Sequence, residues 1–133
     1  MSHIKYKNKN LYVESISVKG LTSKHISPFY LYSSKNIIEN YNNFYNNFKK
    51  VEPLICFSVK ANSNIEILRI LKKIGSGADV VSGGELLKAL KSGIRPNKIV
   101  FSGVGKTEEE LRLAIKKNIL LINVESENEA VLI

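Results

Sequence analysis

Residues 54–90 decide the fold of this chain, and they read LICFSVKANSNIEILRILKKIGSGADVVSGGELLKAL. A short apolar run begins at Leu54, a segment with apolar residues at helical spacing follows it, and a second short apolar run begins at Ala78. Short β-branched runs that do not alternate with polar residues are typical of strands buried on both faces of a parallel sheet. The stretch therefore predicts a strand, a helix and a second strand parallel to the first.

The same pattern recurs along the rest of the chain. Residues 22 positions apart fall in successive apolar runs, so four strands are predicted, over 54–59, 78–81, 99–102 and 120–124. After each run comes Ser or Thr with Glu three residues later, the capping box of a helix start; these pairs begin at Ser63, Ser82, Thr107 and Ser126. The predicted helices stop at Gly75, Gly93 and Asn118, residue types that tolerate the left-handed cap.

Four successive β/α units define an α/β fold, either a doubly wound sheet or a barrel. A (β/α)8 barrel needs about 250 residues, so residues 28–133 are interpreted as the first four β/α units, or N-terminal half, of a TIM-like barrel, truncated at Ile133. Residues 1–27 are expected to form an N-terminal extension with a strand over 11–18. A short strand over 29–32 and a helix capped by Ser33 or Ser34 would lead into the barrel.

The composition is that of an ordinary soluble protein with a net charge of +8. The lysines are scattered along the chain in runs of two at most, which argues against a nucleic-acid surface. No apolar run approaches the ~20 residues of a membrane span. The single cysteine, Cys56, suits a reducing compartment, so we expect a cytoplasmic location. His3 and His25 have no partner at ligand spacing, and no metal site is expected.

Two residues at strand ends could carry chemistry. Lys60 follows the first predicted strand and Asp79 ends the second, on the face where barrel enzymes place their sites. From position alone, a solvated lysine and a capping aspartate remain open interpretations. Glu85 is explained locally by its capping box. The loop 103–107 does not match a phosphate-binding P-loop, because Val100 stands where that motif needs glycine.

Four motifs resemble those of a known enzyme family. Residues 57–64 (FSVKANSN) and 75–86 (GSGADVVSGGEL) are similar to the first- and second-strand motifs of the barrel-type pyridoxal-phosphate decarboxylases. Residues 100–107 (VFSGVGKT) and 123–127 (NVESE) resemble the third and fourth strands of the diaminopimelate decarboxylase family in particular. Alanine racemases share only the VKAN segment. The resemblance runs from about residue 28 to the end of the chain.

The resemblance implies an enzyme in which Lys60 is catalytic and binds pyridoxal 5'-phosphate covalently, with Asp79 beside the cofactor. The implied reaction is decarboxylation of a small amino-acid substrate, meso-diaminopimelate, to L-lysine. In the family the active site forms in a homodimer and uses segments that would lie beyond Ile133, so this chain alone is expected to be inactive without a second half, which a separate gene could encode. Two alternatives stay open: a related decarboxylase acting on ornithine, arginine or carboxynorspermidine, and a non-catalytic remnant.

Overall fold

The computed structural model describes residues 3–133, and the chain divides into two compact units, Met1–Asn47 and Phe48–Ile133. The predicted boundary between residues 27 and 28 stays a prediction. No helix in residues 3–133 is long and apolar enough to cross a membrane.

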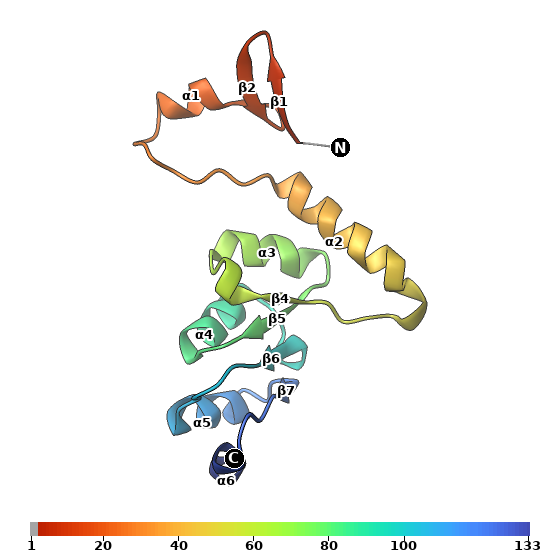
Figure 1. Ribbon diagram of the computed structural model, residues 1–133, viewed down its shortest axis with the longest axis vertical. Coiled ribbons are helices and arrows are strands. Elements are labelled where there is room, and N and C mark those ends of the chain that lie inside the picture. The colour runs from red at the N-terminus through yellow and green to blue at the C-terminus, as the bar shows by residue number, and fades with distance from the viewer. Residues whose placement is uncertain (1–2) are drawn as a thin grey trace. The chain divides into compact units, whose positions relative to one another are not determined.

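The N-terminal unit contains a small antiparallel sheet of order β1-β2-β3 and two helices (Figure 1). Its elements are β1 (Ile4–Lys7), β2 (Asn10–Val13), β3 (Ile16–Ser17), α1 (Val18–Thr22) and α2 (Ser34–Phe48). The strand predicted over 11–18 is confirmed only in part, because a tight turn breaks it at Glu14, whose φ is 56°. The strand predicted over 29–32 is wrong: this segment is irregular, and no strand of the described chain pairs with it.

The start of α2 is fixed by side chains on both sides of the turn. The Ser33 hydroxyl accepts a hydrogen bond from the Asn36 backbone N–H at 3.0 Å, so Ser33 is the cap of the two serines considered. The Glu14 carboxylate accepts hydrogen bonds from the Ser33 hydroxyl at 2.8 Å and from the Lys35 backbone N–H at 3.0 Å. The hydrogen bond from the Lys35 backbone N–H has the largest effect in lowering the pKa of the Glu14 carboxyl group.

The C-terminal unit is a four-stranded parallel sheet in which the strands follow chain order, β4-β5-β6-β7 (Figure 1). The prediction of an α/β fold with a parallel sheet is therefore confirmed. The elements are η1 (Lys49–Val51), β4 (Cys56–Ser58), η2 (Val59–Ala61), α3 (Ile65–Lys73), β5 (Gly77–Val80), α4 (Gly83–Lys91), η3 (Pro96–Lys98), β6 (Ile99–Phe101), α5 (Glu108–Lys116), β7 (Leu121–Ile122) and α6 (Glu127–Leu132).

The hydrophobic core of this unit lies between the sheet and its helices. Ala78 and Val80 of β5 are fully buried, and they pack in one cluster with Leu68 of α3, Leu86 of α4 and Phe101 of β6. Burying the valine, leucine and phenylalanine side chains contributes roughly 1.5–3 kcal/mol each. Successive residues of a strand point to opposite faces, so Asp79, between Ala78 and Val80, points away from this core.

The capping boxes predicted at the four helix starts are confirmed in full at one of them and in part at two. Only Thr107 and Glu110 form a complete capping box. The box predicted at Ser63 is wrong, because Asn64 caps α3 by accepting from the Glu66 backbone N–H at 2.9 Å. The serines before α4 and α6 do cap their helices, but the glutamates three residues later bond elsewhere. The predicted left-handed ends are confirmed, at Gly75, Gly93 and Asn118.

Candidate active site

In a parallel sheet the carboxyl ends of all strands meet at one edge, and Lys60 lies at this edge. It sits in η2, the single helical turn that directly follows β4. Its neighbour Val59 is fully buried in the core, which anchors the turn, while the Lys60 side chain is exposed. Within residues 3–133 the amine of Lys60 makes no hydrogen bond or ion pair. The structure therefore presents an available primary amine at the carboxyl edge of the sheet.

Asp79 lies on the neighbouring strand, in register with Ser58 of β4. The Ser58 hydroxyl donates to Oδ2 of Asp79 at 3.2 Å. The other oxygen, Oδ1, is buried and has no hydrogen-bond partner, the one such side-chain atom found among the described residues. Buried polar atoms in proteins are nearly always paired, so an orphaned carboxylate oxygen marks a place where a donor is missing. The capping interpretation of Asp79 is wrong, since Ser82 caps the next helix.

Two further residues near these strands are already engaged. The Glu85 carboxylate accepts a hydrogen bond from the Val81 backbone N–H at 2.9 Å, so it shapes the turn between β5 and α4. Cys56 is the first residue of β4, at the end of the strand opposite to the carboxyl edge, and burial, reinforced by the charge of Asp79, raises the pKa of its thiol. A thiol with a raised pKa is a poor nucleophile near neutral pH, which leaves Lys60 as the candidate nucleophile at this edge.

The loops after β6 and β7 complete the carboxyl edge. The Asn123 side-chain amide donates to the Ser102 hydroxyl at 2.9 Å, which joins the ends of these two strands. Lys106, in the loop that does not match a P-loop, is buried and donates to the Glu129 carboxylate at 2.7 Å. Sequence reasoning missed this ion pair, because Glu129 matched a local capping box and lies 23 residues away from Lys106.

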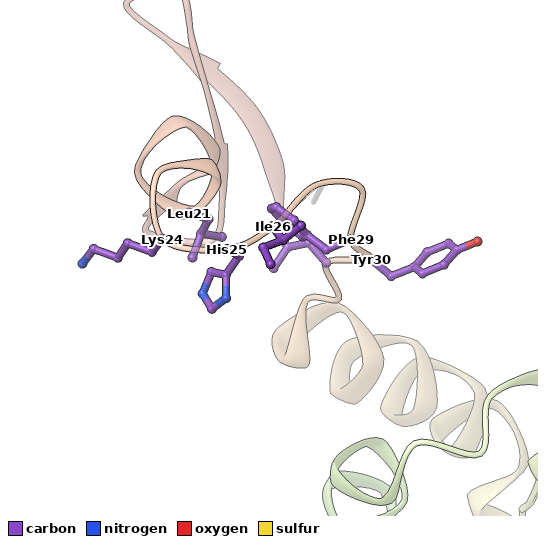
Figure 2. A pocket seen from close by; sticks show the side chains of 7 residues that line it. Leu21, Lys24, His25, Ile26, Phe29 and Tyr30 are labelled. Carbon is purple, nitrogen blue, oxygen red and sulfur yellow. The ribbon is translucent and has the colours of Figure 1, made fainter.

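Other candidate sites are weaker. In the N-terminal unit a pocket of about 530 Å³ is lined by apolar and aromatic side chains with His25 and Lys24 (Figure 2). None of its lining residues was predicted as a site residue. No group of three or more metal-ligating side chains occurs in residues 3–133. His3 forms a hydrogen bond with the Glu39 carboxylate at 2.7 Å, a partner 36 residues away in the chain.

Comparisons with known proteins identify the family. The family model described as the pyridoxal-binding domain of pyridoxal-dependent decarboxylases matches residues 34–133. A diaminopimelate decarboxylase from Aquifex aeolicus is 44% identical over 127 residues, which cover 96% of this chain and 30% of that protein. The crystal structure of a diaminopimelate decarboxylase from M. jannaschii in complex with L-lysine matches with a TM-score of 0.93 and 38% identity, over 97% of this chain and 31% of that one.

A more distant likeness shows the fold alone. An ornithine decarboxylase from Entamoeba histolytica matches over 86% of this chain and 36% of that one, with a TM-score of 0.75 at 24% identity. The chain belongs to the pyridoxal-binding domain family of the pyridoxal-dependent decarboxylases. It spans about a third of the length of the relatives that it matches.

Proposed function

We propose that this chain supplies the cofactor-binding lysine of a diaminopimelate decarboxylase, which converts meso-diaminopimelate to L-lysine and carbon dioxide. Two features on adjacent strands carry the proposal. Lys60 has an exposed amine without a hydrogen-bond partner, and Asp79 has a buried carboxylate oxygen without one. The relatives that share this segment at 44% and 38% identity are named diaminopimelate decarboxylases.

The two residues fit pyridoxal phosphate by their chemistry. A primary amine is the group that condenses with the cofactor's aldehyde, and Lys60 offers one at the carboxyl edge. When bound, pyridoxal phosphate supplies an electron sink for the negative charge left as carbon dioxide departs. Oδ1 of Asp79 keeps an unused acceptor that an amine at the site could donate to, while Ser58 holds the other oxygen in place.

The four β/α units of residues 48–133 are proposed to form the first half of a (β/α)8 barrel. Their sheet has two open edges, at β4 and β7, and barrels close by pairing such edges. The extension over residues 1–27 and the barrel portion over 28–133 are proposed as separate domains of the complete enzyme. A homodimer, a separately encoded second half and a cytoplasmic location are parts of the same proposal.

Covalent trapping tests the role of Lys60. The protein is incubated with pyridoxal phosphate and reduced with borohydride, and the labelled lysine is identified by peptide mass. We expect the label on Lys60 and its loss in Lys60→Ala, with Lys116→Ala as the matched control because Lys116 is also exposed but lies on α5. A label that stays equally strong in Lys60→Ala would refute the proposal.

The substrate is tested by activity. A protein completed with the missing part of the barrel is expected to release carbon dioxide from meso-diaminopimelate faster than from ornithine, arginine or carboxynorspermidine. Preference for one of the other amines would support the related decarboxylase instead. The 133-residue chain by itself is expected to release no carbon dioxide, since it lacks about two thirds of the length of its relatives; turnover by the isolated chain would contradict this.

A further inference from the structure

Lys106 is the most unusual charged residue of the C-terminal unit. Its side chain is 1% exposed, and that of its partner Glu129 is 6% exposed. The ammonium group donates to three acceptors: the Gly103 carbonyl at 2.6 Å, the Asn123 carbonyl at 2.7 Å and the Glu129 carboxylate at 2.7 Å. Lysine has three N–H donors, so all of them are used. The ring of Phe101 lies beneath the ammonium, 5.7 Å from centroid to Nζ.

Helix capping does not explain why Glu129 is turned toward this lysine. In α5 the equivalent glutamate, Glu110, bonds back to the Thr107 backbone and completes its capping box. In α6 the Ser126 hydroxyl likewise accepts a hydrogen bond from the Glu129 backbone N–H, at 3.1 Å. The Glu129 side chain, however, does not bond back to Ser126 and accepts from Lys106 instead. A buried ion pair is itself weak evidence for stability, because desolvation of both charges offsets their attraction. The arrangement therefore calls for a role beyond the ion pair.

The two carbonyls held by Lys106 point to that role. Gly103 is in the loop after β6, and Asn123 directly follows β7, so one ammonium joins both loops at the carboxyl edge. Gly103 has a φ of 90° and packs against Val81, where an added Cβ would lie 3.2 Å from the Val81 Cβ. Val81 is two residues beyond Asp79. The loop that the ammonium holds therefore packs against a residue two positions from Asp79.

We propose that Lys106 is a positioning residue that holds the loops after β6 and β7 in place through the carbonyls of Gly103 and Asn123, while Glu129 serves mainly to neutralise its charge. This role of Lys106 rests on the proposed function, since the two loops border the active site only if Lys60 and Asp79 form it. The contacts themselves do not depend on a cofactor.

Hydrogen exchange separates the carbonyl contacts from the ion pair. The measured quantity is the ratio of exchange in the loops 103–105 and 123–126 to exchange in strand β5. In Lys106→Met and in Lys106→Met/Glu129→Met we expect this ratio to rise roughly tenfold or more, the factor for losing a charge-assisted hydrogen bond. Glu129→Gln leaves the buried ammonium without its counter-charge and should lower the overall stability. The ratio, in which a loss common to the loops and β5 cancels, should still change less than about threefold, because the lysine and both carbonyls remain.

A control variant shows whether a loss of stability alone would change the exchange ratio. Ile94→Ala truncates a buried side chain just before η3, at the amino edge of the sheet, and should lower stability without changing the ratio. If Glu129→Gln loosens the loops as much as Lys106→Met, or if the double variant keeps them protected, the proposal is overturned. The Glu129→Gln arm decides even if the lysine variants do not fold.

A second readout links the loops to the site. Labelling of Lys60 by pyridoxal phosphate and borohydride should be slower in the double variant, by about tenfold, and unchanged in Ile94→Ala. If the wild-type protein is not labelled at Lys60, the proposed function fails, whereas the positioning of the loops is still judged by exchange alone. Equal labelling rates in the wild type and the double variant would show that Lys106 does not act on the site.

Discussion

Replacing Asp79 by asparagine tests whether the carboxylate is kept for chemistry at a cost in stability. Oδ2 accepts a hydrogen bond from Ser58 at 3.2 Å, while Oδ1 is buried without a partner. An unsatisfied buried polar atom costs roughly 1–3 kcal/mol, and more when it carries charge. Because Asp79 is only half-buried, the lower end of that range applies. Asparagine keeps the acceptor for Ser58 and places its neutral NH2 group where the charged Oδ1 was buried. Because a neutral group costs less to bury than a charged one, Asp79→Asn should raise the free energy of unfolding by about 1 kcal/mol.

Urea unfolding in the absence of cofactor measures this change. With a slope of about 2 kcal/mol per molar, the midpoint should rise by roughly 0.5 M. Ser58→Ala is the matched control: it leaves both carboxylate oxygens of Asp79 without a donor and should lower the free energy of unfolding by about 1.5 kcal/mol. The same Asp79→Asn variant should slow borohydride-trapped labelling of Lys60 about tenfold, since an amide cannot take up the proton that the lysine amine must lose before it attacks the aldehyde.

The result that refutes this reasoning is a loss of stability in Asp79→Asn. A variant less stable than the parent by about 1 kcal/mol or more would mean that the carboxylate contributes to the fold, and that its unpaired oxygen is no sign of a missing ligand. Unchanged labelling of Lys60 would separately remove Asp79 from the site. Stability and labelling are thus expected to move in opposite directions, which a purely structural role does not predict.

Two further predictions concern the scaffold. Gly77→Ala should destabilise the protein by about 3 kcal/mol or more, because the new Cβ would lie 2.3 Å from the Lys98 carbonyl oxygen. Gly84→Ala should stabilise it by about 0.5–1 kcal/mol, since its Cβ meets nothing closer than 3.9 Å and alanine favours a helix over glycine. Thermal unfolding of the two variants measures both changes. The hydrogen bond from the Gly83 backbone N–H has the largest effect in lowering the pKa of the Glu110 carboxyl group below its ordinary 4.5. The stabilisation from Glu110 is therefore present above pH 4.5 and lost as pH falls through the lower folded-state pKa; Glu110→Gln should flatten this acid loss in unfolding measured from pH 6 to 3.

The strands of the C-terminal unit could be predicted from the sequence because each is a short apolar run that is followed by a helix start, although only β5 and β6 are largely buried and Leu121 of β7 is half exposed. Short-range chemistry set most helix boundaries: Ser82, Thr107 and Ser126 are the caps that the pattern indicates. The error at Ser63 came from competition, since Asn64 and Ser63 are both capping residues and the local turn selects the asparagine. The N-terminal unit was harder, because its strands are short and their apolar residues are partly exposed.

Long-range partners could not be predicted from local patterns. The capping rule accounts for Glu129 within its own helix, yet its side chain bonds to Lys106 in the loop between β6 and α5. Lys106 itself looked like a loop lysine, and lysines are rarely buried without a partner. The missing information is the lateral packing of one β/α unit on the next, which no spacing within a single unit encodes.

The position of Asp79 depends on how closely β4, β5 and β6 approach one another. Gly77 begins β5 opposite Cys56, and a Cβ there would lie 2.8 Å from the Cys56 sulfur and 2.3 Å from the Lys98 carbonyl oxygen. Only glycine permits this approach, which sets Asp79 opposite Ser58. A shift of one residue in the register would turn the Asp79 carboxylate into the apolar core. The residue that makes the candidate site possible is therefore a glycine two positions before it, which has no side chain to take part in the chemistry.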